Sequence, residues 1–214
     1  MVTRRQTAPA RHRQGALALV ACAAMLIGGC SMTENPYESK TVKGDDAIAL
    51  IDSMRPKGSY EDARRRLNAT AQTIAQRIAA AIPGQTWQFS TNPGVQQVKT
   101  DGLPCEELTG SVARKPLADM VEFGRTFSTA EFATAADIVR QEAATFGATG
   151  ETSLFNEESK KDLDLQGNGY EFNLRQSKAA ILNITGDCFL MQRVLDLPSG
   201  QLPPSPPLTP TPTR

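Results

Sequence analysis

The chain has 214 residues, of which 40% are hydrophobic and 21% charged, as is typical of one folded domain with its own core. Lys plus Arg and Asp plus Glu both number 23, so the totals do not indicate a basic surface for nucleic acid. Four of the arginines and none of the acids lie within residues 1–29, so the remainder is mildly acidic and we expect no nucleic-acid partner.

Residues 1–29 have the three-part build of an export signal peptide. Basic residues extend to Arg13, an apolar run follows over residues 15–29, and small residues precede Cys30. The apolar run has 15 residues, fewer than the ~20 that a membrane-spanning helix needs. We therefore expect this segment to be removed after export.

The sequence Leu26-Ile27-Gly28-Gly29-Cys30 is similar to the lipobox of bacterial lipoproteins, in which the cysteine sulfur receives a diacylglyceryl group and the cysteine becomes the N-terminus. We therefore predict that Cys30 is lipidated, with palmitate-type acyl chains that hold the protein on the extracytoplasmic face of the cell membrane. The alternative is an ordinary secretory signal with an incidental cysteine.

Polar segments that contain proline flank the predicted domain. Residues 30–43 carry almost nothing to bury and should form a flexible tether, which at ~3.3 Å per residue reaches ~40 Å from the lipid surface. Residues 196–214 are rich in Pro and Thr, a composition that favours an extended, disordered tail. The single folded domain is therefore expected over residues 44–195.

Two cysteines, Cys105 and Cys188, remain in the exported domain. Thiols in an oxidising compartment usually pair, and neither residue lies in a CxxC motif. We therefore predict a structural disulfide between them. Two free, buried thiols are the alternative.

One short and two long helices are predicted. The short helix covers residues 45–54 and is stopped by Pro56. The first long helix should begin at Ser59, whose hydroxyl can cap the first turn, and should end at Pro83. Its apolar residues recur every three or four positions, at Leu67, Ala71, Ile74, Ile78 and Ile82.

The second long helix should begin at Ser128 and end near Gly147. Ser128 and Glu131 have the spacing of a capping box, and Gly147 supplies the C-terminal stop. The apolar face of this helix is formed by Phe132, Ala135, Ala136, Val139, Ala143 and Phe146.

The rest of the domain is predicted to form strands. Gly167-Asn168-Gly169 is a turn signal that should join a strand containing Leu163 to one starting at Tyr170. Because each long helix has one apolar face to cover, we expect an α+β fold with both helices packed on one face of a mostly antiparallel sheet, a two-layer sandwich. The other strands are expected at residues 86–90, 109–113, 120–123, 153–157, 179–185 and 188–192.

The mature chain contains no histidine, because His12 lies in the leader. This excludes Ser-His-Asp and Cys-His nucleophilic systems and ordinary zinc or iron sites with histidine ligands. There is also no P-loop, no Gly-rich dinucleotide fingerprint and no HExxH motif. We therefore expect a protein that is not an enzyme and has no cofactor or metal.

Two other functions remain open. A cavity between helices and sheet, lined by residues such as Trp87, Phe132 and Phe146, would make the protein a carrier of a lipid or small ligand. Two carboxylates that converge in a cleft, among Glu157, Glu158, Asp162, Asp164 and Glu171, would favour a hydrolase. A solvated loop is the preferred interpretation of these acids, since lysines interrupt the run.

Six strings spread over residues 45–204 are distinctive: LIDSMRPKGSY from Leu50, AIPGQTW from Ala81, SLFNE from Ser153, QGNGYEF from Gln166, LNITGDC from Leu182 and LDLPSGQLPP from Leu195. Together they resemble the LppA-type lipoproteins of mycobacteria. The resemblance implies a lipid-anchored envelope protein and brings no catalytic residues with it. Our leading expectation is a non-catalytic binding or accessory domain whose partner is an envelope protein or lipid.

Overall fold

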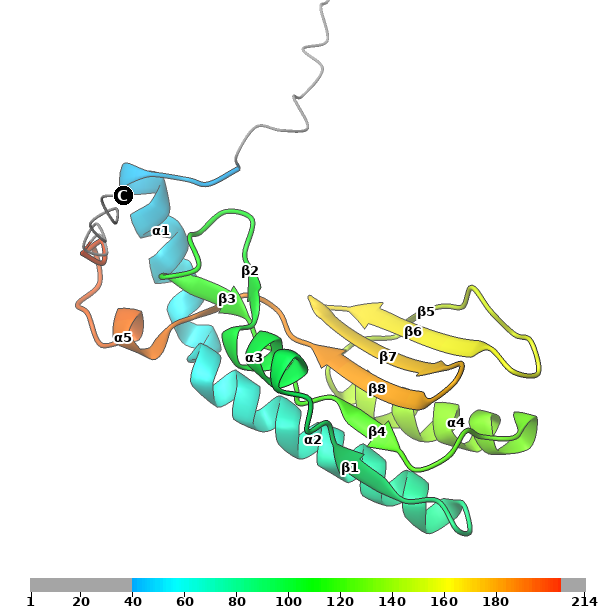
Figure 1. Cartoon of the computed structure of the whole chain (residues 1–214). Helices are drawn as coiled ribbons and strands as arrows, with labels where there is room; N and C mark the ends of the chain where they lie inside the picture. The colour runs from blue at the N-terminus through cyan, green and yellow to red at the C-terminus, as the bar shows by residue number, and fades with distance from the viewer. Residues whose placement is uncertain (1–39, 205–214) are drawn as a thin grey trace, which may run out of the picture. The chain divides into compact units, whose positions relative to one another are not determined.

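The structure is a computed structural model that describes residues 40–204 (Figure 1). The predicted signal peptide, Cys30, residues 31–39 of the tether and residues 205–214 of the tail lie outside the described residues. Within the described part, no helix is both long enough and apolar enough to cross a membrane.

Six strands form one antiparallel sheet in the order β1-β4-β8-β7-β6-β5, and three form a smaller sheet in the order β2-β3-β9. The helices are α1 (Gly44–Met54), α2 (Tyr60–Ala81), α3 (Pro93–Asp101), α4 (Thr129–Thr145) and α5 (Gln192–Leu195). The strands are β1 (Trp87–Phe89), β2 (Leu103–Pro104), β3 (Ala113–Lys115), β4 (Val121–Phe123), β5 (Gly150–Thr152), β6 (Lys161–Gly167), β7 (Tyr170–Gln176), β8 (Ala180–Thr185) and β9 (Phe189–Leu190).

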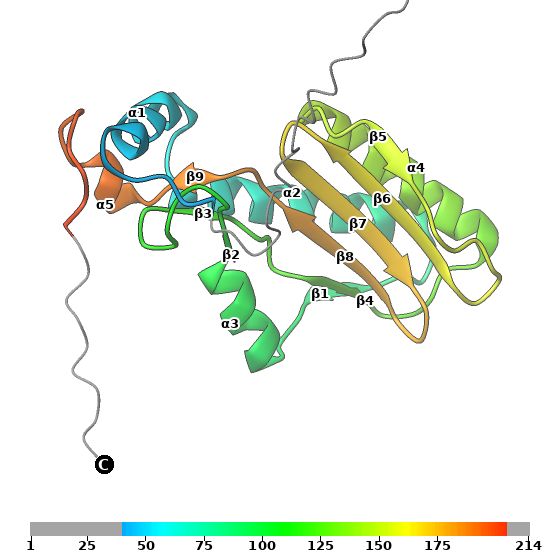
Figure 2. The same cartoon turned by 90° about the horizontal axis from the view of Figure 1, so that it is seen from above.

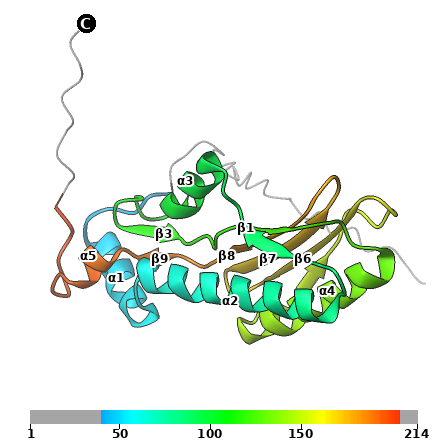
Figure 3. The same ribbon diagram turned by 60° about the horizontal axis from the view of Figure 1, so that its bottom comes forward.

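The predicted α+β fold is confirmed. Helices α2 and α4 lie together on one face of the six-stranded sheet, and α3 lies on the opposite side (Figure 3). Figure 2 shows the face of the sheet that α2 and α4 leave uncovered. Its strands place polar side chains such as Glu122, Asn173 and Asn183 on that face, in alternation with core residues.

The main core lies between this sheet and the two long helices. The predicted stripe of α2 is buried throughout, and Ile74 and Ile78 are fully inaccessible. Helix α4 contributes three alanines and three larger residues, with Val139 fully buried at its centre. From the sheet, Phe172 and Leu174 complete the core. The apolar periodicity of both helices therefore identified the buried faces correctly.

The predicted hairpin is formed by β6 and β7. Leu163 pairs with Leu174 and Leu165 pairs with Phe172. Asn168 (φ 49°) and Gly169 (φ 80°) form its two-residue turn, the left-handed pair that a type I′ turn requires. The Asn-Gly signal thus fixed both the turn and the register.

A second, smaller core lies at the end of the domain where α1 begins. Helices α1 and α5 pack there against the three-stranded sheet (Figure 1), around Ile51, Ala113, Leu190 and Val194. The 22 residues of α2 contact both sheets, since its neighbours include β3 and β9 as well as β4 and β8. One long helix therefore links the two cores.

Two local predictions were wrong. Residues 153–157 form a loop, in which Leu154 N and Phe155 N donate to the Asp162 carboxylate and not to a neighbouring strand. Residues 109–112 form a turn in which Thr109 O accepts two backbone N–H groups, so the strand there starts at Ala113. Helix α3, which Asn92 caps, was not predicted.

Ordered contacts extend beyond both predicted domain boundaries. On the tether side, Val42 N donates to Glu107 O (3.0 Å). On the tail side, Arg55 donates to the carbonyls of Leu195 and Pro198, and Gly200 N donates to Asp52. Composition alone does not reveal backbone groups that Asp52 of α1 and the following Arg55 bind. The boundary at residue 195 itself stays a prediction.

Candidate functional site

The disulfide between Cys105 and Cys188 is present in the structure, with 6.0 Å between the Cα atoms. Cys105 follows β2 and Cys188 precedes β9, so the bridge joins the two outer strands of the small sheet. Both cysteines pack against the second core. The bridge is a structural cross-link, and Cys30, the predicted lipidation site, lies outside the described residues.

A groove of about 460 Å³ opens beside this bridge. Its apolar part is formed by Leu50, Met54, Leu108 and the disulfide. Two ion pairs stand on its rim, Lys40 with Glu106 (3.2 Å) and Lys57 with Asp187 (2.5 Å). An apolar lining with a charged rim is the usual build of a binding site for a small ligand or a peptide segment. The groove is larger than three other pockets of the described residues, which measure about 290 to 320 Å³.

Of the acids considered for hydrolysis, Glu157, Asp162 and Glu171 do not converge. Asp164 and Glu171 do approach each other, since Asn173 Nδ2 donates to Asp164 Oδ1 (2.5 Å) and to Glu171 Oε1 (3.0 Å). Asp162 Oδ1 accepts hydrogen bonds from Ser153 Oγ, Leu154 N and Phe155 N, at 2.8–2.9 Å. Burial alone would raise the pKa of Asp162, but these hydrogen bonds outweigh burial and the pKa lies below its usual value. The carboxylate is therefore ionised, and its Oδ1 atom holds the loop in place.

Glu171 lies at the other end of the β6–β7 hairpin. It pairs with Gln166, four residues along β6 from Asp162, which corresponds to ~13 Å at the strand rise of ~3.3 Å per residue. Its Oε1 accepts from Asn173, while Glu157 is exposed on the loop. No group of His, Cys, Asp and Glu side chains in residues 40–204 is arranged to hold a metal ion.

The residues considered for a carrier cavity pack into the protein interior or its edge. Trp87 stacks edge-on against Phe89, with ring centroids 5.5 Å apart, and both pack on the main core. Phe146 lies against Tyr170 and Phe172. Phe132 is 8% exposed and contributes to the same core. Phe132 also lines a pocket of about 290 Å³ between α4 and strands β5 and β6, together with Ala136 and Leu163. The carrier alternative therefore stays a prediction.

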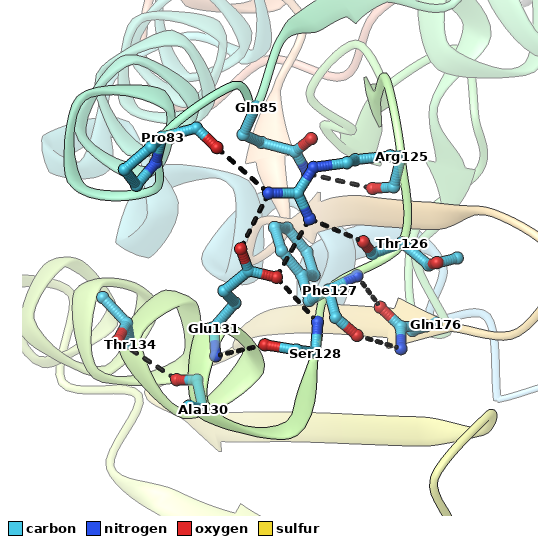
Figure 4. Close-up of polar contacts among 10 residues, drawn as sticks. All are labelled: Pro83, Gln85, Arg125, Thr126, Phe127, Ser128, Ala130, Glu131, Thr134 and Gln176. Carbon is cyan, nitrogen blue, oxygen red and sulfur yellow. Dashed lines mark hydrogen bonds and ion pairs between the residues drawn. The ribbon is translucent and has the colours of Figure 1, made fainter.

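A dense polar cluster joins the ends of four elements (Figure 4). Arg125, after β4, donates to both carboxylate oxygens of Glu131 at 2.7 and 2.9 Å and to Pro83 O after α2. Glu131 also accepts from Ser128 N, which completes the predicted capping box of α4. The Gln176 amide of β7 binds both backbone polar groups of Phe127.

This cluster is structural. The hydrogen bonds from Arg125, followed by that from Ser128 N, lower the pKa of Glu131 to about 2. A carboxylate that is permanently ionised and has its oxygens already bonded is a poor general acid or base. The sequence predicted the capping box but not the role of Arg125, since nothing marked its contact with Pro83, 42 residues away.

The lowered pKa predicts a pH-dependent contribution to stability. Because the carboxylate has its lower pKa in the folded state, its contribution is fully present above about pH 4.5 and is lost as the pH falls towards about 2. We expect Glu131→Gln to abolish this part of the pH dependence when free energies of unfolding are measured between pH 6 and pH 2. Glu157→Gln, on an exposed loop, is the control. Parallel curves for wild type and Glu131→Gln would contradict the assignment.

Comparison with known proteins places these features in a family. Residues 34–192 match the family described as "LppA: Lipoprotein confined to pathogenic Mycobacterium". The chain belongs to the LppA family. LppA of Mycobacterium tuberculosis is 58% identical over 206 residues, which cover 96% of this chain and 94% of the relative, and LppB of that organism is 57% identical over the same span.

A solved structure in this family supports the fold. The crystal structure of LppA from Mycobacterium tuberculosis is similar with a TM-score of 0.73 and 63% sequence identity, covering 74% of this chain and 94% of that chain. The resemblance stated from the sequence strings is thereby confirmed. The LppA relatives are named as lipoproteins, in agreement with a lipoprotein assignment for this chain.

Proposed function

We propose that this LppA-family protein is anchored by lipid at Cys30 to the extracytoplasmic face of the cell membrane and acts there as a non-catalytic binding or accessory domain of the envelope. The observation that carries the proposal is the lipobox-type sequence ending at Cys30, placed ten residues before a folded domain that contains a disulfide. Disulfides form and persist in oxidising compartments outside the cytoplasm.

The position of the groove supports a binding role near the membrane. Lys40, the first described residue, contributes to its rim. Residues 31–39 separate it from Cys30, and even fully extended they hold Lys40 within ~35 Å of the anchor. The groove would therefore face components of the membrane or the adjoining envelope, such as a lipid or a membrane-associated protein.

The side-chain chemistry supports a non-catalytic role. Asp162 and Glu131, two of the described carboxylates with a lowered pKa, use their oxygens to hold backbone N–H groups of a loop and of a helix start. Perturbed carboxylates often mark active sites, but the third among the described residues, Glu151, is held in an ion pair by Arg140.

Cys30→Ala tests the anchor. The variant lacks the sulfur that carries the diacylglyceryl group, so we expect the protein to move from the membrane fraction to the soluble extracytoplasmic fraction and to leave the detergent phase on Triton X-114 partitioning. Cys22→Ala, within the leader, changes the same residue type without removing the predicted acylation site and should partition as wild type. Equal retention of the Cys30→Ala variant in the detergent phase would refute the anchor.

A further inference from the structure

Arginines that lack a carboxylate partner identify a second candidate site, at the end of the domain that contains the three-stranded sheet. Of the ten arginines in residues 40–204, seven have a carboxylate oxygen within 4.0 Å. The other three are Arg66, Arg114 and Arg193. Arg66 lies over the Phe189 ring, 6.0 Å from its centroid. Arg114 and Arg193 both line one pocket of about 320 Å³, here called the arginine pocket.

Backbone carbonyls hold the two guanidinium groups in place without neutralising them. Arg114 donates from Nε to Gly110 O (2.8 Å) and from Nη1 to Asp101 O (2.6 Å). Arg193 donates from Nη2 to Ser111 O (2.8 Å). Nη2 of Arg114, and Nε and Nη1 of Arg193, have no hydrogen-bond partner among the described residues. Both cations are thus oriented and retain unused donors at the same pocket.

The other polar groups of the pocket leave an excess of positive charge. Asp101 is its one carboxylate, and its Oδ2 accepts from Gln97 Nε2 (2.9 Å). The Tyr60 hydroxyl donates to Thr100 O, and burial raises the pKa of Tyr60, so this group stays neutral. Ser111 contributes a hydroxyl. Two guanidinium groups therefore share the pocket with one acid, one phenol and two hydroxyl residues, Thr100 and Ser111.

We propose that the arginine pocket binds a phosphate ester of a small hydroxylated molecule, with the phosphate oxygens at the free N–H groups of Arg114 and Arg193 and a hydroxyl of the ligand at Asp101. A phosphate presents several charged oxygens that two guanidinium forks can share, whereas a carboxylate is satisfied by one fork. Asp101 would repel a second anionic group but accepts a hydrogen bond from an alcohol, which favours a phosphorylated polyol.

The pairing of β3 with β9 creates this site. Arg114 lies opposite Phe189 in the small sheet, and Arg193 follows β9 in α5, so two residues far apart in the sequence reach one pocket. Met191 N donates to Val112 O, which fixes the approach of the two segments. The site goes beyond the proposed anchoring function and does not depend on it, because no acyl chain takes part in the contacts.

The test measures binding of phosphate probes to the full chain carrying Cys30→Ala, so that no acyl group contributes. Titration calorimetry with inorganic phosphate, glycerol 3-phosphate and inositol 1-phosphate covers free ligands, and co-sedimentation with vesicles of phosphatidylinositol in phosphatidylcholine covers lipid headgroups. We expect saturable binding to glycerol 3-phosphate or inositol 1-phosphate that weakens as salt rises. Binding to the vesicles but to no free ester would identify a headgroup as the source of the phosphate.

Three variants locate the site. Arg193→Gln, at an exposed residue, should weaken binding by about tenfold to a hundredfold through the loss of charge-assisted hydrogen bonds. Arg114→Lys keeps the charge but loses the fork and should weaken binding by about tenfold. Arg66→Gln removes the same charge at an arginine outside the pocket and should bind as the parent chain does.

Two results would overturn the proposal. One is the absence of saturable binding to any of the free esters and to the vesicles. The other is a failure of Arg193→Gln to weaken binding more than Arg66→Gln does, which would show attraction to the overall surface charge in place of a built site. Circular dichroism of each variant confirms that the fold is retained.

Discussion

Replacing Cys105 and Cys188 together by Ala is expected to lower the free energy of unfolding by about 4 kcal/mol. The two residues are 83 positions apart, and the chain-entropy treatment assigns a loss of that order to a loop of this length. The cross-link joins β2 to the start of β9, so α1 and the small sheet should loosen first. Hydrogen exchange at Met191 N, which bonds across the small sheet, reports on that region.

Reductant supplies the matched control for the disulfide. Urea unfolding of the wild-type protein in dithiothreitol should approach that of the double variant, and the double variant should be unchanged by dithiothreitol. Peptide mapping without reduction should find Cys105 joined to Cys188. Free thiols at both positions, together with a urea midpoint of the wild-type protein that dithiothreitol does not change, would contradict the cross-link.

Gly167→Ala is expected to destabilise the fold by about 3 kcal/mol. A Cβ at this position, at the end of β6, would lie 2.1 Å from Gly147 O and 3.0 Å from Ala148 Cα. Both contacts are backbone atoms of the turn after α4, so α4 and the hairpin would have to separate. In thermal unfolding, a loss of this size lowers the midpoint by about 6–12 °C in a domain of this length.

Gly94→Ala is the matched control for this close approach. Its Cβ would meet only Asn92 Oδ1 at 3.4 Å, on the surface of α3. The change in the free energy of unfolding should stay within about 1 kcal/mol. If Gly167→Ala unfolded at the same temperature as Gly94→Ala, the packing of the α4 turn onto the β6–β7 hairpin would be wrong.

Local sequence patterns predicted those parts of the fold that depend on contacts between residues near each other in the sequence. Ile74 and Ile78 follow the helical period and are fully buried, and Ser128 caps α4 as its spacing with Glu131 indicates. The Asn168-Gly169 turn set the register of the central hairpin. In each of these cases the deciding interaction lies within a few residues along the chain.

The errors arose where a side-chain contact outside the local helix or strand pattern determines the backbone conformation. Residues 153–157 have an apolar pattern suited to a strand, but the Asp162 carboxylate binds their N–H groups and forms a loop. The tail was expected to begin at residue 196 and to be free, but Arg55, 143 positions before Pro198, donates to the carbonyl of Pro198. Composition describes what a segment can bury and does not reveal such polar contacts.

The candidate sites were predicted only in part. The pairing of Cys105 with Cys188 followed from the small number of cysteines and the expected compartment. The groove needs Lys57 near Asp187, 130 positions apart, and the arginine pocket needs Arg114 near Arg193. These approaches depend on the pairing of β3 with β9, two short strands with no distinctive periodicity. A single sequence without the fold could not bring these residues together.

The most direct test of the account is mass spectrometry of the N-terminal peptide of the protein extracted from membranes of its own cells. We predict a peptide that begins at Cys30 and carries the mass of a diacylglyceryl group. Treatment with a reductant should not remove this added mass. A chain that retains residues 1–29, or that begins at an unmodified Cys30, would contradict the lipid anchor on which the proposed function depends.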